Sequence, residues 1–331
     1  MSSKPTNPPL ARRSRRKRIG LIVCAVLVII VIALAIGLGV GLTRGGSGST
    51  PSAPSSAPTS TVSPLPSPTV QPAWTPTVNS TWQIVLENPL ELSSDAASIT
   101  PDVEVYDIDL FTNGAEVIST LHKLGKKVIC YFSAGSYEPD RPDSGDFKDA
   151  DKGKEMDGWP GEYWLNLNST NVRNIMTKRV ELAAQKGCDA VDPDNVDGYS
   201  NNNGLSLTPA DSIAFLSFLS NATLTHKLSL GLKNAAAIID AVLPLVHFSV
   251  NEQCAQYAEC SNFTAFITHH KPVFHIEYPD AGKKVSTTQV NDYCGAAADA
   301  ANFSTVIKLT DLDGWVEYCN YAAFTTLLNS S

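Results

Sequence analysis

The fold is decided by two short apolar segments, KKVICYFSA (126–134) and CDAVDPD (188–194), together with the stretch VRNIMTKRVELAAQK (172–186) that lies before the second. The two segments are rich in β-branched residues and apolar on both faces, which is typical of strands covered on both sides. The stretch between them has a helical spacing of apolar residues. Strand, helix and strand in this order predict parallel strands joined by a helix.

The same pattern continues in both directions along the chain. Six more apolar runs have the length and composition of strands: TWQIVLE (81–87), VEVYDIDL (103–110), LSLGLKN (228–234), VHFSVNE (246–252), PVFHIEY (272–278) and STVIKLT (304–310). A second helix is expected over PADSIAFLSFLSNA (209–222), with Thr208 as its N-cap and Pro209 at its first position. Eight strands within residues 81–331 predict an α/β fold, a (β/α)8 TIM-type barrel. An open doubly wound sheet is the alternative, although no Gly-x-Gly-x-x-Gly turn follows the first strand.

A transmembrane helix is expected before this domain. Residues 19–43 carry no charge and are long enough to cross a bilayer. The basic tail 1–18 holds six basic residues between Arg12 and Arg18, and only Arg44 follows the apolar segment. The positive-inside rule then predicts a single-pass type II protein of the cell membrane with its large domain outside the cell. A signal peptide cleaved near Gly45 or Gly46 is the alternative.

Residues 44–80 are expected to form a disordered linker. Eight Pro and fifteen Ser or Thr fall between positions 45 and 80, a composition that forms no packed core. We expect an extended, O-glycosylated stalk that ends where the barrel begins, and that can be clipped to release the domain. All six Asn-x-Ser/Thr motifs lie after Arg44 and indicate a glycoprotein. They begin at Asn79, Asn168, Asn221, Asn262, Asn302 and Asn329.

The seven cysteines divide between the membrane segment and the predicted outer side. Cys24 lies in the apolar segment, and the other six lie on the predicted outer side, where disulfide bonds persist. Cys254–Cys260 is the most local pairing and Cys294–Cys319 the next, whereas Cys130 and Cys188 could instead be buried thiols. No Cys-x-x-Cys pair or His/Cys cluster occurs. We therefore expect neither a metal nor a cofactor.

The charge distribution excludes one class of partner. The net charge of −8 includes eight basic residues before position 45, which leaves 17 basic against 33 acidic residues, or −16, for the rest of the chain. Nucleic-acid binding needs the opposite sign. A cationic partner is compatible with this charge.

Acidic residues follow several of the predicted strands, and this pattern indicates where chemistry takes place. In (β/α)8 barrels the active site lies at the carboxyl ends of the strands. A pair of carboxylates facing each other there is what a glycosidase needs. The segment 188–199 has a second interpretation as a calcium loop, but Val196 and Asn203 stand where the motif requires ligands, which favours a capped turn. Lys233 could equally pair with a carboxylate inside the barrel or contact substrate.

Five phrases give the domain a family resemblance: WQIVLEN (82–88), KKVICYFSAGSYE (126–138), GCDAVDPDNVDGY (187–199), SLGLKN (229–234) and FSVNEQC (248–254). Together they resemble glycoside hydrolase family 114, whose founding activity is endo-α-1,4-polygalactosaminidase. The anchor and stalk are similar to those of fungal members that act on galactosaminogalactan, a cationic polysaccharide. The resemblance implies a barrel, a carboxylate mechanism without a metal, and Asp194 with Glu252 as the catalytic pair.

The sequence also leaves roles and alternatives to be tested. By analogy with other α-glycosidase barrels we expect retention, with Asp194 as nucleophile and Glu252 as acid/base, but a wider gap between the carboxyl groups would give inversion. We expect the residues that position the sugar and tune the pair to be Asp107, Tyr131, Asp192, Asp197 and Lys233. A barrel that binds polysaccharide without cleaving it, and a hydrolase of a neutral α-glycan, are the alternative functions.

Overall fold

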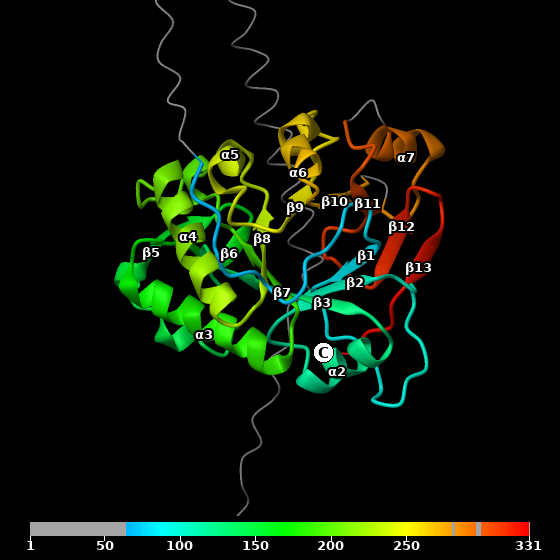
Figure 1. Ribbon diagram of the computed structural model, residues 1–331, viewed down its shortest axis with the longest axis horizontal. Helices are drawn as coiled ribbons and strands as arrows, with labels where there is room; N and C mark the ends of the chain where they lie inside the picture. Colours follow the sequence, from blue (N-terminus) through cyan, green and yellow to red (C-terminus); the bar gives the residue numbers. More distant parts are fainter. Residues whose placement is uncertain (1–63, 280–281, 296–298, 331) are drawn as a thin grey trace, which may run out of the picture. The chain divides into compact units, whose positions relative to one another are not determined.

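The computed structural model describes residues 64–279, 282–295 and 299–330. Its main sheet begins with eight strands that pair in parallel, in the order β1-β2-β3-β7-β8-β9-β10-β11 (Figure 1). These are β1 (Trp82–Val85), β2 (Val105–Asp109), β3 (Lys127–Ser133), β7 (Ala190–Asp194), β8 (Ser229–Lys233), β9 (Phe248–Glu252), β10 (Val273–Glu277) and β11 (Ser304–Ile307). All eight predicted strands are confirmed, each a few residues shorter than its apolar run.

The sheet curls so that its first and last parallel strands meet. The Trp82 indole on β1 donates to the Ser304 carbonyl on β11 at 2.7 Å. Alternate residues of the strands form one apolar cluster inside the curl, including Ile84, Ile129 and Val250. Their neighbours along the strands belong to a second cluster, which the surrounding helices complete. The result is a curled, mainly parallel α/β sheet of the TIM-barrel type.

The helices cover the outer face of the sheet. They are α2 (Ala115–Lys123), α3 (Thr170–Lys186), α4 (Pro209–Thr225), α5 (Ile239–Val242), α6 (Thr264–Thr268) and α7 (Thr287–Cys294). The helix α3 packs against α4, and the two lie against β7 and β8 (Figure 1). Both predicted helices are confirmed, and the Thr208 hydroxyl caps α4 by accepting from the Asp211 backbone N–H.

Two smaller parts of the fold were not predicted. The main sheet continues beyond β11 as the antiparallel strands β12 (Trp315–Tyr318) and β13 (Ala323–Thr325). A second sheet of order β4-β6-β5 consists of β4 (Ser136–Tyr137), β5 (Lys152–Met156) and β6 (Trp159–Leu165). Short 3-10 turns occur at Ser144–Asp146, Asp149–Asp151, Gly198–Ser200, Ala236–Ile238 and Cys260–Phe263.

The end of the predicted linker lies against the domain. The Leu65 N–H donates to the Ala241 carbonyl at 3.1 Å, and the Ala73 N–H donates to the Lys227 carbonyl at 2.8 Å. The Trp74 ring packs against the apolar interior of the sheet, with the Lys127 ammonium 5.7 Å from its centre. Lys127 begins β3, so residues 64–80 cover the amino ends of the strands.

The predicted tail, transmembrane helix and first part of the linker, residues 1–63, lie outside the described residues. None of the helices in the described part of the chain is both long enough and apolar enough to cross a membrane.

Three disulfide bonds join the six cysteines of the domain. Cys254–Cys260 and Cys294–Cys319 are confirmed. Cys130 on β3 and Cys188 just before β7 are joined to each other, which decides between the two alternatives for this pair. Cys130–Cys188 therefore ties β3 to the segment that leads into its neighbour β7.

Candidate active site

The alternation of the strands directs the predicted site residues to the inside of the curled sheet. On β8, Leu230 and Leu232 pack with the outer cluster, so Lys233 faces the interior. The same alternation turns Asp107 on β2, Tyr131 on β3, Asp192 and Asp194 on β7, and Glu252 on β9 inward. Asp194, Lys233 and Glu252 end their strands and Tyr131 lies near the end of β3, where barrel enzymes hold their chemistry. Asp107 and Asp192 lie at the middle of β2 and β7.

Lys233 bridges the two predicted catalytic carboxylates. Its Nζ lies 3.0 Å from Asp194 Oδ2 and 3.1 Å from Glu252 Oε2. The sum of these distances, 6.1 Å, is the upper limit for the separation of the two oxygens. The Lys233 side chain is 3% exposed, whereas those of Asp194 and Glu252 are 16% and 25% exposed. The two carboxylates therefore face the solvent side, and the ammonium lies beneath them.

Asp194 is held by three donors from three elements. Its Oδ2 accepts from the Tyr131 hydroxyl at 2.9 Å and from Lys233, and its Oδ1 accepts from the Asn195 backbone N–H at 2.6 Å. Asn195 has a φ of 60°, and its carbonyl passes close over Gly135, where a Cβ would lie 1.7 Å from that oxygen. The glycine after β3 is thus what lets the turn after Asp194 cross the site.

Glu252 is held as an ionised group. The Asn234 side chain donates to Glu252 Oε2 at 3.1 Å and accepts from the Glu252 backbone N–H at 2.9 Å. The Tyr278 hydroxyl donates to Oε1. Burial alone would raise the pKa of Glu252, but the Lys233 charge and these donors outweigh it and hold the pKa below its ordinary value. The same two carboxylates raise the pKa of Lys233 against the effect of its burial.

Two of the predicted carboxyl groups lie deeper. Asp107 and Asp192 are fully buried. Burial raises the pKa of Asp192 to about 8, aided by the charges of Asp194 and Glu252 and opposed by Lys233. Burial and the Asp192 charge raise the pKa of Asp107 well above its ordinary value. In the turn after β7, burial and the Asp194 charge raise the pKa of Asp197 to about 6.

Sequence reasoning missed two residues of this site, Asn234 and Tyr278. Both directly follow a strand, Asn234 after β8 and Tyr278 after β10. The signal that selected Lys233, a polar residue at the end of an apolar run, was therefore present for both. Their partner Glu252 lies on a different strand, β9, and the sequence does not show which of several polar strand ends will meet.

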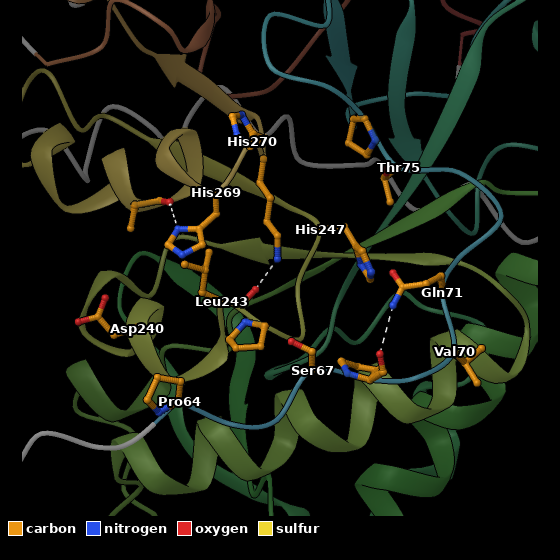
Figure 2. Close-up of a pocket in the computed structure, with 15 residues that line it drawn as sticks. Pro64, Ser67, Val70, Gln71, Thr75, Asp240, Leu243, His247, His269 and His270 are labelled. Carbon is orange, nitrogen blue, oxygen red and sulfur yellow. Dashed lines mark hydrogen bonds between the residues drawn. The ribbon is translucent and has the colours of Figure 1, made fainter.

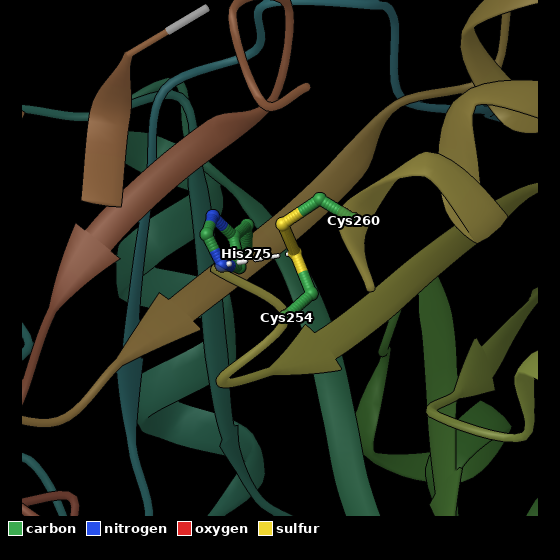
Figure 3. Close-up of side chains that lie close together, drawn as sticks. All are labelled: Cys254, Cys260 and His275. Carbon is green, nitrogen blue, oxygen red and sulfur yellow. Dashed lines mark hydrogen bonds between the residues drawn. A yellow bond between two sulfur atoms is a disulfide. The ribbon is translucent and has the colours of Figure 1, made fainter. Parts of the chain in front are cut away.

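The structure contains one close group of three metal-ligand residues within its described ranges. Cys254, Cys260 and His275 have ligand atoms within 4.8 Å of one another (Figure 3). The two sulfurs are bonded to each other, so neither is available as a thiolate. His275 Nε2 lies 2.8 Å from Glu277 Oε1, which also accepts from the Ala255 N–H at 2.8 Å. This group therefore holds the loop that follows Glu252.

A cavity of about 810 Å³ lies away from these carboxylates. Its walls come from residues 64–76 and from segments between 240 and 271, with His247, His269 and His270 among them (Figure 2). His247 directly precedes β9, so the cavity is at the amino ends of the strands. It contains neither Asp194 nor Glu252, and we do not assign the chemistry to it.

Comparisons with known proteins agree with this geometry. The model of glycoside-hydrolase family GH114 matches residues 64–324. Among solved structures, Aspergillus fumigatus Ega3 in complex with galactosamine is 52% identical, with a TM-score of 0.70 over 75% of this chain and 98% of that chain. The glycoside hydrolase domain of PelA from Pseudomonas aeruginosa is 12% identical, with a TM-score of 0.51 over 70% of this chain and 96% of that chain, a likeness of fold alone. No protein with a curated description matches. The chain belongs to glycoside-hydrolase family GH114 and is a glycoside hydrolase.

Proposed function

We propose that this protein cleaves α-1,4-linked galactosamine within a cationic, galactosaminogalactan-type polysaccharide, and that Asp194 and Glu252 carry the reaction. The observation that carries the proposal is the pair of partly exposed carboxylates bridged by Lys233. The relative from Aspergillus fumigatus, solved with galactosamine, supports the sugar. The excess of 33 acidic over 17 basic residues beyond position 44 supports a cationic polymer.

The separation of the carboxylates favours retention of configuration. Retaining glycosidases hold their carboxyl groups about 5–5.5 Å apart, whereas inverting enzymes need about 6.5–9.5 Å to admit a water. The upper limit of 6.1 Å between Asp194 Oδ2 and Glu252 Oε2 fits the first class. Asp194 then attacks the anomeric carbon while Glu252 gives its proton to the leaving glycosidic oxygen. In the second step Glu252 takes a proton from water, which releases Asp194 and the sugar.

The acid role requires Glu252 to gain a proton after the sugar binds. Lys233, Tyr278 and Asn234 keep this carboxylate ionised in the structure. A sugar ring over the pair removes water from a side chain that is 25% exposed, and loss of water raises a carboxyl pKa. A sugar hydroxyl that takes over one of the three donors acts in the same direction.

We also propose that the enzyme acts outside the cell, anchored by residues 19–43 as a single-pass type II protein. The uncharged segment, the basic flank before it and the glycosylation sites after it support this topology. The described chain reaches the domain at the amino ends of the strands, along residues 64–80. Substrate therefore approaches from the end of the sheet opposite to this segment.

Two variants of the catalytic pair test the reaction. Residues 64–331 with Glu252→Gln or Asp194→Asn are incubated with partly deacetylated galactosamine polymer, and the products are analysed by mass. Each variant is expected to lose turnover by about 100- to 10,000-fold or more, because the acid or the nucleophile is gone. Asp149→Asn, at a fully exposed side chain, is the matched control and is expected to cut like the parent protein.

Azide distinguishes the two roles. With an activated leaving group, Glu252→Gln is expected to regain the first step and to give a retained azide product, and Asp194→Asn an inverted one. Turnover equal to the parent protein in either variant removes that residue from the mechanism. A parent protein that binds the polymer without shortening it would establish the alternative, a binding barrel.

A further inference from the structure

Two buried carboxyl groups inside the sheet have no hydrogen-bond donor. All four side-chain oxygens of Asp107 and Asp192 are buried, and no N–H or O–H group of the described protein lies within hydrogen-bond distance of them. Asp109, two residues after Asp107 and also buried, accepts from two backbone N–H groups and pairs with Arg141. The fold therefore satisfies one buried carboxylate of β2 fully and leaves the other without any protein donor.

A buried carboxyl group without a hydrogen-bond donor is unstable in its ionised form. Burying an unpaired charge costs several kcal/mol or more, and the group takes up a proton instead. Lys233 is the cation that acts on both acids, but among the carboxylates of the described residues its Nζ is within 4 Å only of Asp194 and Glu252. The raised pKa of both acids follows from the same burial. The geometry thus indicates that Asp107 and Asp192 are neutral, because Lys233 is already paired with Asp194 and Glu252.

The surroundings of the two acids are strongly charged. Among the described residues, the titratable groups that face this interior are Asp107 and Asp109 on β2, Arg141 paired with Asp109, Tyr131 on β3, Asp194 and Asp197 on and after β7, Lys233 on β8, Glu252 on β9 and Tyr278 after β10. With Asp107 and Asp192 neutral, the Lys233 ammonium pairs with the two proposed catalytic carboxylates. Ionisation of Asp192 adds a third anion that competes for the same ammonium.

We propose that Asp107 and Asp192 are positioning residues which act as a neutral acid pair: while both keep their protons Lys233 stays on Asp194 and Glu252, and when Asp192 ionises Lys233 is drawn away and activity falls. The inference rests on the proposed roles of Asp194 and Glu252. Neither acid touches the sugar in this scheme, because both are fully buried.

The pH profile of activity is the first test. The full chain in detergent is compared with Asp192→Asn and Asp107→Asn, which keep the shape but cannot ionise, and each profile is normalised to its own maximum. We expect the alkaline half-point of the parent protein near pH 8, where Asp192 loses its proton, and a half-point at least one unit higher in Asp192→Asn. The control Asp149→Asn is expected to follow the parent profile. An unchanged half-point in Asp192→Asn overturns the proposal, because a merely structural role does not depend on this proton.

A second measurement does not depend on activity. The folded pKa of Asp192 is raised above its unfolded value near 4, so stability is lost as the pH rises from about 4 through about 8. We expect the urea midpoint of the parent protein to fall between pH 5 and pH 9, and to fall less in Asp192→Asn. If the parent protein does not cleave the polymer but the midpoints behave as stated, the proposed function fails and the acid pair stands.

A third readout needs no variant. The infrared carbonyl band of protonated carboxyl groups is expected in the folded parent protein at pH 7, and it should diminish above pH 8. The band can be measured on the parent protein even if neither Asn variant folds. Absence of the band at pH 7 would show that the acids are ionised and would overturn the proposal.

Discussion

Lys233 is the residue on which both proposed catalytic carboxylates depend. Its Nζ is about equally distant from Asp194 and Glu252, and its side chain is almost completely buried. Lys233→Met keeps the length of the chain and removes the charge, so the two carboxylates repel each other and the pKa of Glu252 rises. We expect turnover to fall at least about 100-fold, measured as kcat on the polymer. Lys178→Met, at an exposed lysine, is the control, and parent-like turnover in Lys233→Met would contradict the bridging role.

Ionisation of Asp197 is expected to make the affinity for the polymer depend on pH. Its pKa of about 6 means that the carboxylate forms as the pH rises from 5 to 7. A carboxylate beside Asp194 attracts the ammonium of galactosamine, whereas the neutral acid does not. We expect KM on deacetylated polymer to fall over this pH range, and to change little in Asp197→Asn. Equal pH dependence of KM in both proteins would exclude Asp197 from substrate binding.

The residues also show what the sequence could and could not reveal. Asp107, Asp192 and Asp194 look alike in the sequence, as acidic residues near the ends of apolar runs. The strand period of two turns all three inward, but it does not give their depth, which separates the partly exposed carboxylate of Asp194 from the two fully buried acids. The contacts of Asn234 and Tyr278 with Glu252 come from the packing of neighbouring strands, which no local pattern encodes.

At the scale of elements, prediction succeeded where hydrophobic patterning is strong. The eight parallel strands are buried on both faces, α3 has apolar residues at helical spacing, and α4 is largely apolar. The strands β5, β6 and β13 are different, because most of their residues are exposed or partly exposed, and β12 is a buried strand of only four residues. Their pairing depends on tertiary context, which overrides weak local preference.

The loop after β9 allows a matched comparison of two disulfide bonds. Cys254–Cys260 closes a loop of six residues next to Glu252, and Cys130–Cys188 closes one of 58 residues between β3 and β7. The chain-entropy model gives a loss of about 2 kcal/mol of unfolding free energy for the first and about 4 kcal/mol for the second when each pair is replaced by Ala. We expect the activity to respond in the opposite order, since only the first bond holds the segment that carries Glu252.

Denaturant unfolding and kcat, measured on both double variants, check this expectation. The His275–Glu277 contact remains in the Cys254→Ala/Cys260→Ala protein. We therefore expect this variant to keep part of the parent activity. If the Cys130→Ala/Cys188→Ala protein loses more activity per unit of stability lost, the loop is not what positions Glu252.

For the whole molecule, the proposed topology predicts where the domain is accessible. Residues after Arg44 contain all six Asn-x-Ser/Thr motifs, and residues 1–18 contain the basic flank. Deglycosylation of the cell-expressed protein should lower its apparent mass, and protease added to intact cells should remove the hydrolase domain. Protection of the domain until the membrane is opened would reverse the orientation.

The charge of the whole domain predicts how it meets its substrate. Beyond position 44 the acidic residues exceed the basic ones by 16, and a field of this sign attracts the ammonium groups of deacetylated galactosamine at mildly acidic pH. Attraction between exposed charges is screened over about 10 Å at 0.1 M salt and about 3 Å at 1 M. We therefore expect kcat/KM on the deacetylated polymer to fall as salt is raised over this range. On a fully N-acetylated polymer, which lacks these charges, the rate should be lower at 0.1 M and nearly independent of salt. Because salt screens the field without altering the bridged carboxylates, kcat at saturating polymer should change little in either case. If both polymers are cut equally fast and salt has no effect on kcat/KM, the acidic surface contributes to solubility and not to substrate capture.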